Sequence, residues 1–174
     1  MSVFSPAQFH FHAPSEHTVD GSHHDLECHI VHTYADTNGM LGGVIGIFFD
    51  VQEGGDYPNP LLDALWNEEG NDVKIPLASF LAGVDMTEYW NYNGSLTTPP
   101  CTEGIKWTVV KQVQPISTAQ LAKFTSLWAG AADFAEGKGN NRATQPLNER
   151  TLYFNGAASL SVAFAAAAVA ALTF

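Results

Sequence analysis

Three histidines have a spacing that can gather their imidazole rings around one metal ion. His10 and His12 stand in Gln8-Phe9-His10-Phe11-His12, and His29 follows in Glu27-Cys28-His29-Ile30-Val31-His32. Side chains of an extended strand alternate between its faces, so His10 and His12 project to the same side. A second strand that folds back beside the first could add His29 from that side. Three imidazoles with an open fourth position are typical of a catalytic zinc site, whereas structural zinc sites usually have four protein ligands.

Two further residues strengthen the metal hypothesis. Gln8 and Glu27 each stand two residues before one of the histidines, on the same strand face. Either side chain can accept the second ring N–H of an imidazole, as the partners of metal-bound histidines commonly do. The pattern occurs twice, which favours a metal site. A His-x-His sequence by itself is weak, and ordinary strand histidines remain the alternative interpretation of these residues.

Two polar clusters have side chains that could assist such a site. In Ser15-Glu16-His17-Thr18, Glu16 could orient a neighbouring hydroxyl and His17 could satisfy buried backbone groups. In Ser95-Leu96-Thr97-Thr98-Pro99-Pro100, the prolines would fix two hydroxyls near a loop tip. A solvated loop and a rigid turn, respectively, are the alternatives.

The elements that must position these residues are mostly strands. Residues 42–51 form a continuous β-branched and aromatic run that predicts a strand buried on both faces. Residues 104–113 predict a second strand, in which the middle residues alternate between apolar and polar. Residues 59–66 and 117–128 predict short helices, the second with Leu121, Phe124, Leu127 and Trp128 on its apolar stripe. Turn-rich connections separate these elements. We therefore expect a mainly β fold with a few short helices.

Composition limits the classes of function. The 174 residues fit one domain, and 45% of them are hydrophobic. The formal net charge of −11 would repel a phosphate backbone, so nucleic acid is excluded as a partner. Cys28 and Cys101 are too few for a disulfide scaffold, although they could pair with each other.

The two ends of the chain differ. Residues 1–6 show no basic or strongly apolar segment, so no signal peptide is visible. Residues 157–174 contain no charged residue and are rich in alanine. Three interpretations of this tail stay open: a membrane-spanning segment, a removed anchor signal, or a packed C-terminal helix. We treat 1–156 as the domain and 157–174 as an apolar tail that would provide any membrane association.

Seven motifs occur in an order and spacing that resemble the α-type carbonic anhydrases. They extend from Gln8 to Leu147 and so cover most of the chain; they are Gln8–His12, Ser15–Gly21, Glu27–His32, Gly46–Phe48, Tyr89–Cys101, the strand with Trp107, and Asn141–Leu147. The resemblance implies a large, twisted, mostly antiparallel sheet. It also implies that Zn2+ is the cofactor and that His10, His12 and His29 are its ligands.

The resemblance implies roles for further residues. Thr97 would accept a hydrogen bond from zinc-bound hydroxide and donate its own proton to Glu16, and Thr98 would line the bicarbonate side. Gln8 and Glu27 match the hydrogen-bond partners of the zinc ligands. An apolar wall would hold carbon dioxide, although plain core packing is the alternative for its members: Val31, Val44, Leu96, Ile105 and Trp107.

The implied reaction is reversible hydration of carbon dioxide to bicarbonate and a proton, by attack of zinc-bound hydroxide. In carbonic anhydrases zinc lowers the pKa of the bound water to about 7, a known property of that family. The implied partners are carbon dioxide and bicarbonate, with sulfonamides or anions as inhibitors. The alternative is an incomplete or non-catalytic chain of this type, inactive alone or acting as a binding module.

The chain departs from the family pattern before Gln8. Family members have a substantial segment there, which includes the usual proton-shuttling histidine, whereas here only residues 1–7 precede Gln8. His23 and His24 lie in a loop without a counterpart, so we expect slow proton release from an intact site. Cys101, an Asn93-Gly94-Ser95 sequon and the apolar tail favour a secretory or cell-surface location. The sequence does not set the oligomeric state.

Overall fold

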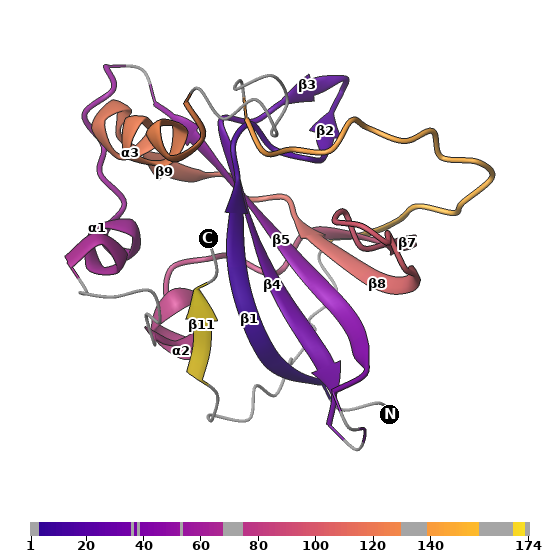
Figure 1. Cartoon of the computed structure of the whole chain (residues 1–174). Coiled ribbons are helices and arrows are strands. Elements are labelled where there is room, and N and C mark those ends of the chain that lie inside the picture. Colours follow the sequence, from indigo (N-terminus) through magenta and orange to yellow (C-terminus); the bar gives the residue numbers. More distant parts are fainter. Residues whose placement is uncertain are drawn as a thin grey trace.

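A computed structural model describes residues 4–35, 37, 39–52, 54–67, 75–129, 139–156 and 169–172. A nine-stranded mixed sheet dominates it (Figure 1). Its strands are β1 (Phe4–His12), β4 (Leu26–Tyr34), β5 (Leu41–Val51), β6 (Ile75–Pro76), β7 (Tyr89–Ser95), β8 (Glu103–Val110), β9 (Gln114–Ile116), β10 (Tyr153–Asn155) and β11 (Val169–Leu172). Their order is β10-β7-β8-β5-β4-β1-β11-β6, with β9 beside β5. The expected mainly β class is confirmed, and antiparallel pairs outnumber parallel ones.

The long central strands β1, β4 and β5 run side by side (Figure 1). Both pairs are antiparallel, and their register sets His10 opposite His29 and His29 opposite Gly46. Between β1 and β4 the chain reverses through a two-stranded hairpin of β2 (Thr18–Val19) and β3 (Ser22–His23). Asp20 and Gly21 have positive φ angles of 51° and 80° at its turn, a conformation that Asp and Gly tolerate better than most residues.

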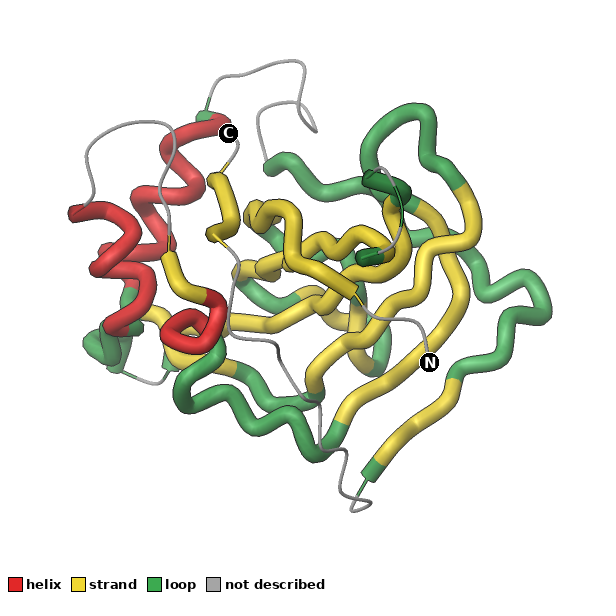
Figure 2. Tube along the Cα trace, turned by 90° about the horizontal axis from the view of Figure 1, so that it is seen from below, coloured by secondary structure: helices red, strands yellow, loops and turns green. Residues whose placement is uncertain are grey.

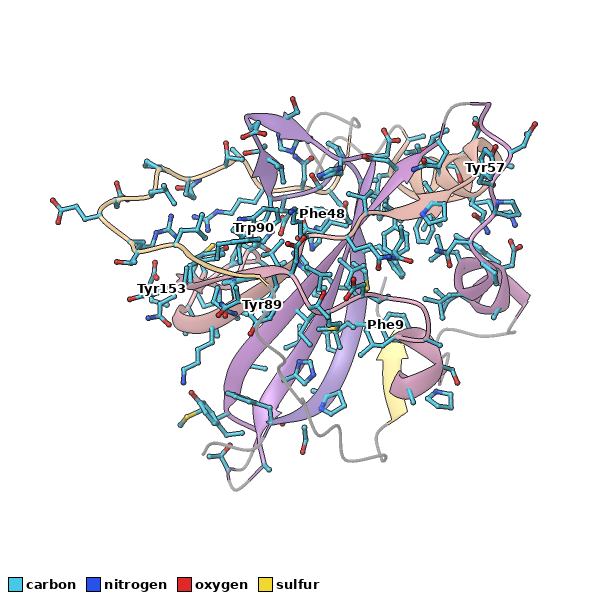
Figure 3. The ribbon with its side chains drawn as sticks, turned by 180° about the vertical axis from the view of Figure 1, so that it is seen from behind. Phe9, Phe48, Tyr57, Tyr89, Trp90 and Tyr153 are labelled. Atoms are coloured by element: carbon cyan, nitrogen blue, oxygen red, sulfur yellow. The ribbon has the colours of Figure 1, made fainter. Side chains whose placement is uncertain are left out.

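The two faces of these strands contribute to different cores, as strand alternation requires. Phe9 of β1 belongs to the core that contacts the helices, whereas Phe48 of β5, labelled with it in Figure 3, belongs to a second core. This second core includes Trp107, whose ring contacts that of His29. The side chains of Phe9 and Phe48 are fully buried. Burial of one such side chain stabilises the fold by roughly 1.5–3 kcal/mol. The histidine strands are therefore supported from both sides.

The helices gather on one side of the molecule (Figure 2). They are α1 (Pro60–Asn67), α2 (Leu77–Phe80) and α3 (Thr118–Trp128), and α1 and α3 agree with the predicted ranges 59–66 and 117–128. Asn59 accepts the N–H of Leu61, while Ser117 caps α3 with a capping box.

The expected apolar stripe of α3 is only partly correct. Phe124 is buried, but Leu127 is 45% exposed. Gln120 occupies a buried position instead, because its side chain bonds the backbone N–H and C=O of Asn59 and so links the starts of α1 and α3. A polar side chain thus takes part in the interface that the leucine spacing assigned to apolar residues.

The structure bears on two open questions from the sequence: the conformation of the apolar tail and the pairing of the two cysteines. Residues 157–168 and 173–174 of the apolar tail lie outside the described residues. Val169–Leu172 form β11, a strand parallel to β1, and not part of a helix. Within the described part of the chain, no helix is long and apolar enough to cross a membrane.

Cys28 and Cys101 are free thiols, so the disulfide that the sequence left open is not formed.

Candidate metal centre

β1 and β4 bring His10, His12 and His29 together. Each of the three offers one ring nitrogen, and these nitrogens lie within 4.8 Å of one another. The ring centroids are 5.0 Å apart for the pair on β1 and 4.5 and 5.3 Å from His29. The β1–β4 register explains this convergence, because His10 and His29 are direct cross-strand partners. The sequence-predicted ligand set is therefore a spatial cluster.

Hydrogen bonds determine which nitrogen of each β1 histidine is free. Nδ1 of His10 donates to Oε1 of Gln8 at 2.8 Å. Nδ1 of His12 donates to the backbone carbonyl of Asn140 at 3.1 Å. Both rings are thereby fixed with Nε2 as the remaining nitrogen. Nε2 of His12 is buried and has no hydrogen-bond partner among the described residues, which is the state expected of an atom that awaits a ligand.

His29 is held the other way round. Its Nε2 donates to Oε1 of Glu27 at 2.9 Å, and this leaves Nδ1 free. The three free nitrogens are thus two Nε2 atoms and one Nδ1 atom. Each of the three rings has an acceptor on its second nitrogen, which is the arrangement that orients histidine ligands in metal sites.

The β1 histidines are neutral at physiological pH. Burial, together with the neighbouring His29, lowers the pKa of His10 to about 3. Burial and the two other histidines lower the pKa of His12 to about 2. A neutral imidazole keeps the lone pair that a metal ion needs. The site is therefore ready to bind a cation without first releasing protons from these two rings.

Glu27 is the most constrained side chain near the centre. It is fully buried and accepts four hydrogen bonds: from His29 Nε2, from His17 Nδ1 at 2.6 Å, and from the backbone N–H groups of Glu16 and His17 at 2.9 and 3.0 Å. Burial alone would raise the pKa of Glu27, but the charges and hydrogen bonds of His17 and His29 hold it well below its usual range. Glu27 is therefore a carboxylate.

His17 has a different role from the backbone contact expected of it. Its Nδ1 donates to Glu27, and its Nε2 lies 2.7 Å from the hydroxyl of Tyr92. Burial would lower the pKa of His17, but the charge of Glu27, their hydrogen bond and the charge of Glu16 raise it. The sequence pattern did not reveal this, because Glu27 and Tyr92 follow His17 by 10 and 75 residues, beyond the range of strand alternation. His17, Glu27 and His29 also have metal-ligand chemistry, but their facing atoms already bond one another.

Glu16 has one satisfied and one unsatisfied carboxylate oxygen. Oε1 accepts the backbone N–H of Arg142 at 2.7 Å. Oε2 is buried without a hydrogen-bond partner within the described part of the chain, 3.8 Å from Nδ1 of His29. The bond from Thr97 to Glu16 that the resemblance implied is thus not formed in this structure. Thr97 is half-buried and Thr98 exposed, in a loop held instead by its own backbone bond from Leu96 N–H to Thr102 C=O.

An apolar surface adjoins the cluster on the β5 and β8 side. Four of the five expected wall residues are buried in one core, and the fifth, Leu96, packs against it; the four are Val31, Val44, Ile105 and Trp107. The ring of Trp107 lies 4.7 Å from that of His29, and its Nε1 donates to the carbonyl of Ser95. A surface of this kind, with few polar groups, suits a small uncharged ligand.

Residues 1–156 match the family model of the eukaryotic-type carbonic anhydrases. A carbonic anhydrase of Pectobacterium carotovorum is 39% identical, over 86% of this chain and 58% of its own length. The alpha carbonic anhydrase 3 of Arabidopsis thaliana is 36% identical, over 88% of this chain and 54% of its own length. The chain thus spans less than three fifths of the length of these two relatives.

Solved structures agree with the family match. The α-carbonic anhydrase of Thermovibrio ammonificans, in complex with the inhibitor sulfanilamide, is 39% identical with a TM-score of 0.68, over 87% of this chain and 63% of that one. A halotolerant carbonic anhydrase of Dunaliella salina is 31% identical with a TM-score of 0.72, over 88% and 61%.

Proposed function

The chain belongs to the eukaryotic-type carbonic anhydrase family, and we propose that it hydrates carbon dioxide reversibly to bicarbonate and a proton with one Zn2+ ion. The proposed zinc ligands are Nε2 of His10, Nε2 of His12 and Nδ1 of His29. The observation that carries the proposal is that one ring nitrogen from each of the three histidines lies within 4.8 Å of the others.

The donor set fits zinc. Three neutral imidazoles with an open fourth position are a usual catalytic zinc environment. The buried, unpartnered Nε2 of His12 supports the fit, because burial of an unsatisfied polar atom costs roughly 1–3 kcal/mol unless a ligand satisfies it. Bound there, zinc would supply a hydroxide nucleophile near neutral pH by lowering the pKa of a coordinated water.

The protein's own groups orient and shield the reaction. Gln8, Glu27 and the carbonyl of Asn140 hold the three rings through their second nitrogens. The apolar wall beside His29 would hold carbon dioxide and keep competing water away from it. Carbon dioxide has no charge to bind, so an apolar surface is the appropriate recognition element.

Thr97 and Glu16 are the proposed positioning pair for the attacking oxygen. A Thr97 hydroxyl that donates its hydrogen bond to Glu16 Oε2 can only accept a hydrogen bond from the attacking oxygen, and this would direct the lone pair of that oxygen toward the substrate. The unpaired state of Oε2 supports this role, because that oxygen has no competing donor among the described residues. Thr98, at the exposed side of the same loop, is proposed to face bicarbonate.

Sulfonamides are the proposed inhibitors, since a family member of known structure binds sulfanilamide. The alternative is that the chain binds zinc but does not catalyse the reaction by itself. This alternative is supported by the chain's coverage of only 58% of the length of the Pectobacterium relative. Stopped-flow hydration of carbon dioxide separates the two. We expect activity that a chelator removes, that added zinc restores and that sulfanilamide inhibits. A zinc-loaded, folded protein without activity would support the alternative.

A further inference from the structure

Gly46 occupies a position where glycine is otherwise unfavourable. It lies in the middle of β5, directly opposite His29 of β4 and beside Val109 of β8. Glycine inside a strand adds no packing and loses conformational entropy on folding, and it often marks a close approach of another group. Gly46 is absent from the glycines with positive φ, so the backbone itself does not require glycine here. The reason for glycine at this position must therefore be the absence of a side chain.

The space beside Gly46 contains the carboxylate of Glu27. A Cβ atom at Gly46 would lie 2.8 Å from Oε1 of Glu27, closer than real contacts allow, whereas its next neighbour, Cγ2 of Val109, would lie at an ordinary 3.7 Å. The conflict is therefore with one oxygen atom, and that oxygen is the acceptor for Nε2 of His29.

Displacement of the Glu27 carboxylate would cost free energy, because it would break buried hydrogen bonds. Both of its oxygens are engaged in hydrogen bonds, two of them from the backbone N–H groups of Glu16 and His17. The side chain is fully buried, so no solvent replaces a lost bond. Loss of a partner from such a buried charged group is costly.

We propose that Gly46 is a positioning residue for the metal centre: its missing side chain provides the space from which Glu27 orients His29. The inference rests on the proposed zinc function, and it adds a residue that contacts neither metal nor substrate. A side chain at position 46 displaces the carboxylate, releases the ring of His29 and weakens zinc binding.

Gly43 offers a matched control on the same strand. A Cβ there would lie 3.3 Å from the carbonyl oxygen of Lys106 and 3.9 Å from the ring of Phe4, and it touches no group of the metal centre. Gly43 pairs with His32, which is not a proposed ligand. Gly43→Ala therefore reports the general cost of adding a methyl group to β5.

The test compares zinc affinity, by chelator competition, in Gly46→Ala and Gly43→Ala. We expect zinc binding to weaken about tenfold or more in Gly46→Ala, the loss typical for removal of a ligand's hydrogen-bond partner, and to change less than about twofold in Gly43→Ala. Equal affinities in wild type and Gly46→Ala would overturn the proposal.

A metal-free readout keeps this inference separate from the proposed function. In zinc-free protein, nitrogen-edited NMR should show a slowly exchanging Nε2–H of His29 in wild type and Gly43→Ala, and its loss in Gly46→Ala. Failure of the wild type to bind zinc would refute the proposed function while the NMR comparison still decides the role of Gly46. Retention of the resonance in Gly46→Ala would overturn that role.

A shorter carboxylate at position 27 tests whether Gly46 acts through Glu27, and this test remains informative if Gly46→Ala alone fails to fold. Glu27→Asp withdraws the oxygen by one methylene, so the added methyl group of Gly46→Ala should then fit. In the wild-type background, we expect Gly46→Ala to lower the denaturant midpoint of the zinc-free protein or to prevent folding. In the Glu27→Asp background, we expect the same substitution to change the denaturant midpoint little. An equal loss in both backgrounds would show that Gly46 does not act through Glu27.

Discussion

Oε1 of Glu27 accepts the Nε2–H of His29 at 2.9 Å, and this bond selects Nδ1 as the free nitrogen of that ring. The other two rings of the centre present Nε2. One carboxylate therefore decides how the β4 histidine faces the β1 pair, and the chemistry of the centre depends on a residue outside the ligand set.

Glu27→Gln should weaken zinc binding by about 10- to 100-fold, because an amide oxygen is a poorer acceptor and its NH2 group would face donors. Chelator competition measures the change. Glu88→Gln is the control, since Glu88 pairs with Lys111 at the surface. Equal zinc affinity in Glu27→Gln and wild type would contradict the assigned role.

The zinc-free protein should lose stability as the pH falls below 6.5. Burial lowers the folded-state pKa values of His10, His12 and His32, whereas the unfolded chain binds protons at these positions near pH 6.5. The contribution of these three groups to stability is therefore fully present above that pH and declines toward pH 4.5, by up to about 1.4 kcal/mol per pH unit for each group. The raised pKa of His17 acts in the opposite sense, but only above pH 6.5.

Denaturant unfolding at several pH values checks this dependence. His12→Gln removes one of the three groups, so its stability should fall less steeply between pH 6.5 and 4.5. A slope identical to that of the wild type would show that His12 is not a buried neutral imidazole.

Thr97→Ala should reduce the hydration rate by about 100-fold while zinc content stays unchanged, since loss of one orienting hydrogen bond in an active site costs on this order. Thr97→Ser keeps the hydroxyl and should retain most of the rate. Stopped-flow measurement on samples of equal zinc content makes the comparison. Equal rates for the Ala and Ser variants would remove Thr97 from the mechanism.

Imidazole buffer should accelerate hydration at saturating carbon dioxide. His32 is buried, and the two ring nitrogens of His17 already bond Glu27 and Tyr92, so neither histidine is available as a carrier of protons to solvent. A rate that rises with buffer concentration and then saturates is the expected result. A rate insensitive to imidazole would contradict the expected slow proton release.

Strand alternation was enough to predict much of the centre. It correctly set His10, His12 and Gln8 on one face of β1, because that relation depends only on a two-residue period. The same reasoning paired Glu27 with His29 on β4. The predicted ranges of α1 and α3 also agreed with the structure, since their caps and proline are local features.

Long-range contacts were beyond the sequence pattern. The acceptor for His12 is a backbone carbonyl 128 residues away, at Asn140, and a carbonyl gives no residue-specific indication. The interaction of His17 with Glu27 depends on how the hairpin of β2 and β3 folds over β4. The burial of Gln120 depends on its bonds to the backbone of Asn59, which helical periodicity does not predict.

Zinc stoichiometry in ligand variants tests the central claim most directly. Purified wild type, His12→Gln and the exposed-site control His23→Gln would be titrated with zinc against a chromophoric chelator. We expect one zinc ion per chain in wild type and His23→Gln, and no zinc retained by His12→Gln at the same chelator concentration. Equal zinc retention in all three proteins would show that the β1–β4 histidine cluster is not the metal centre.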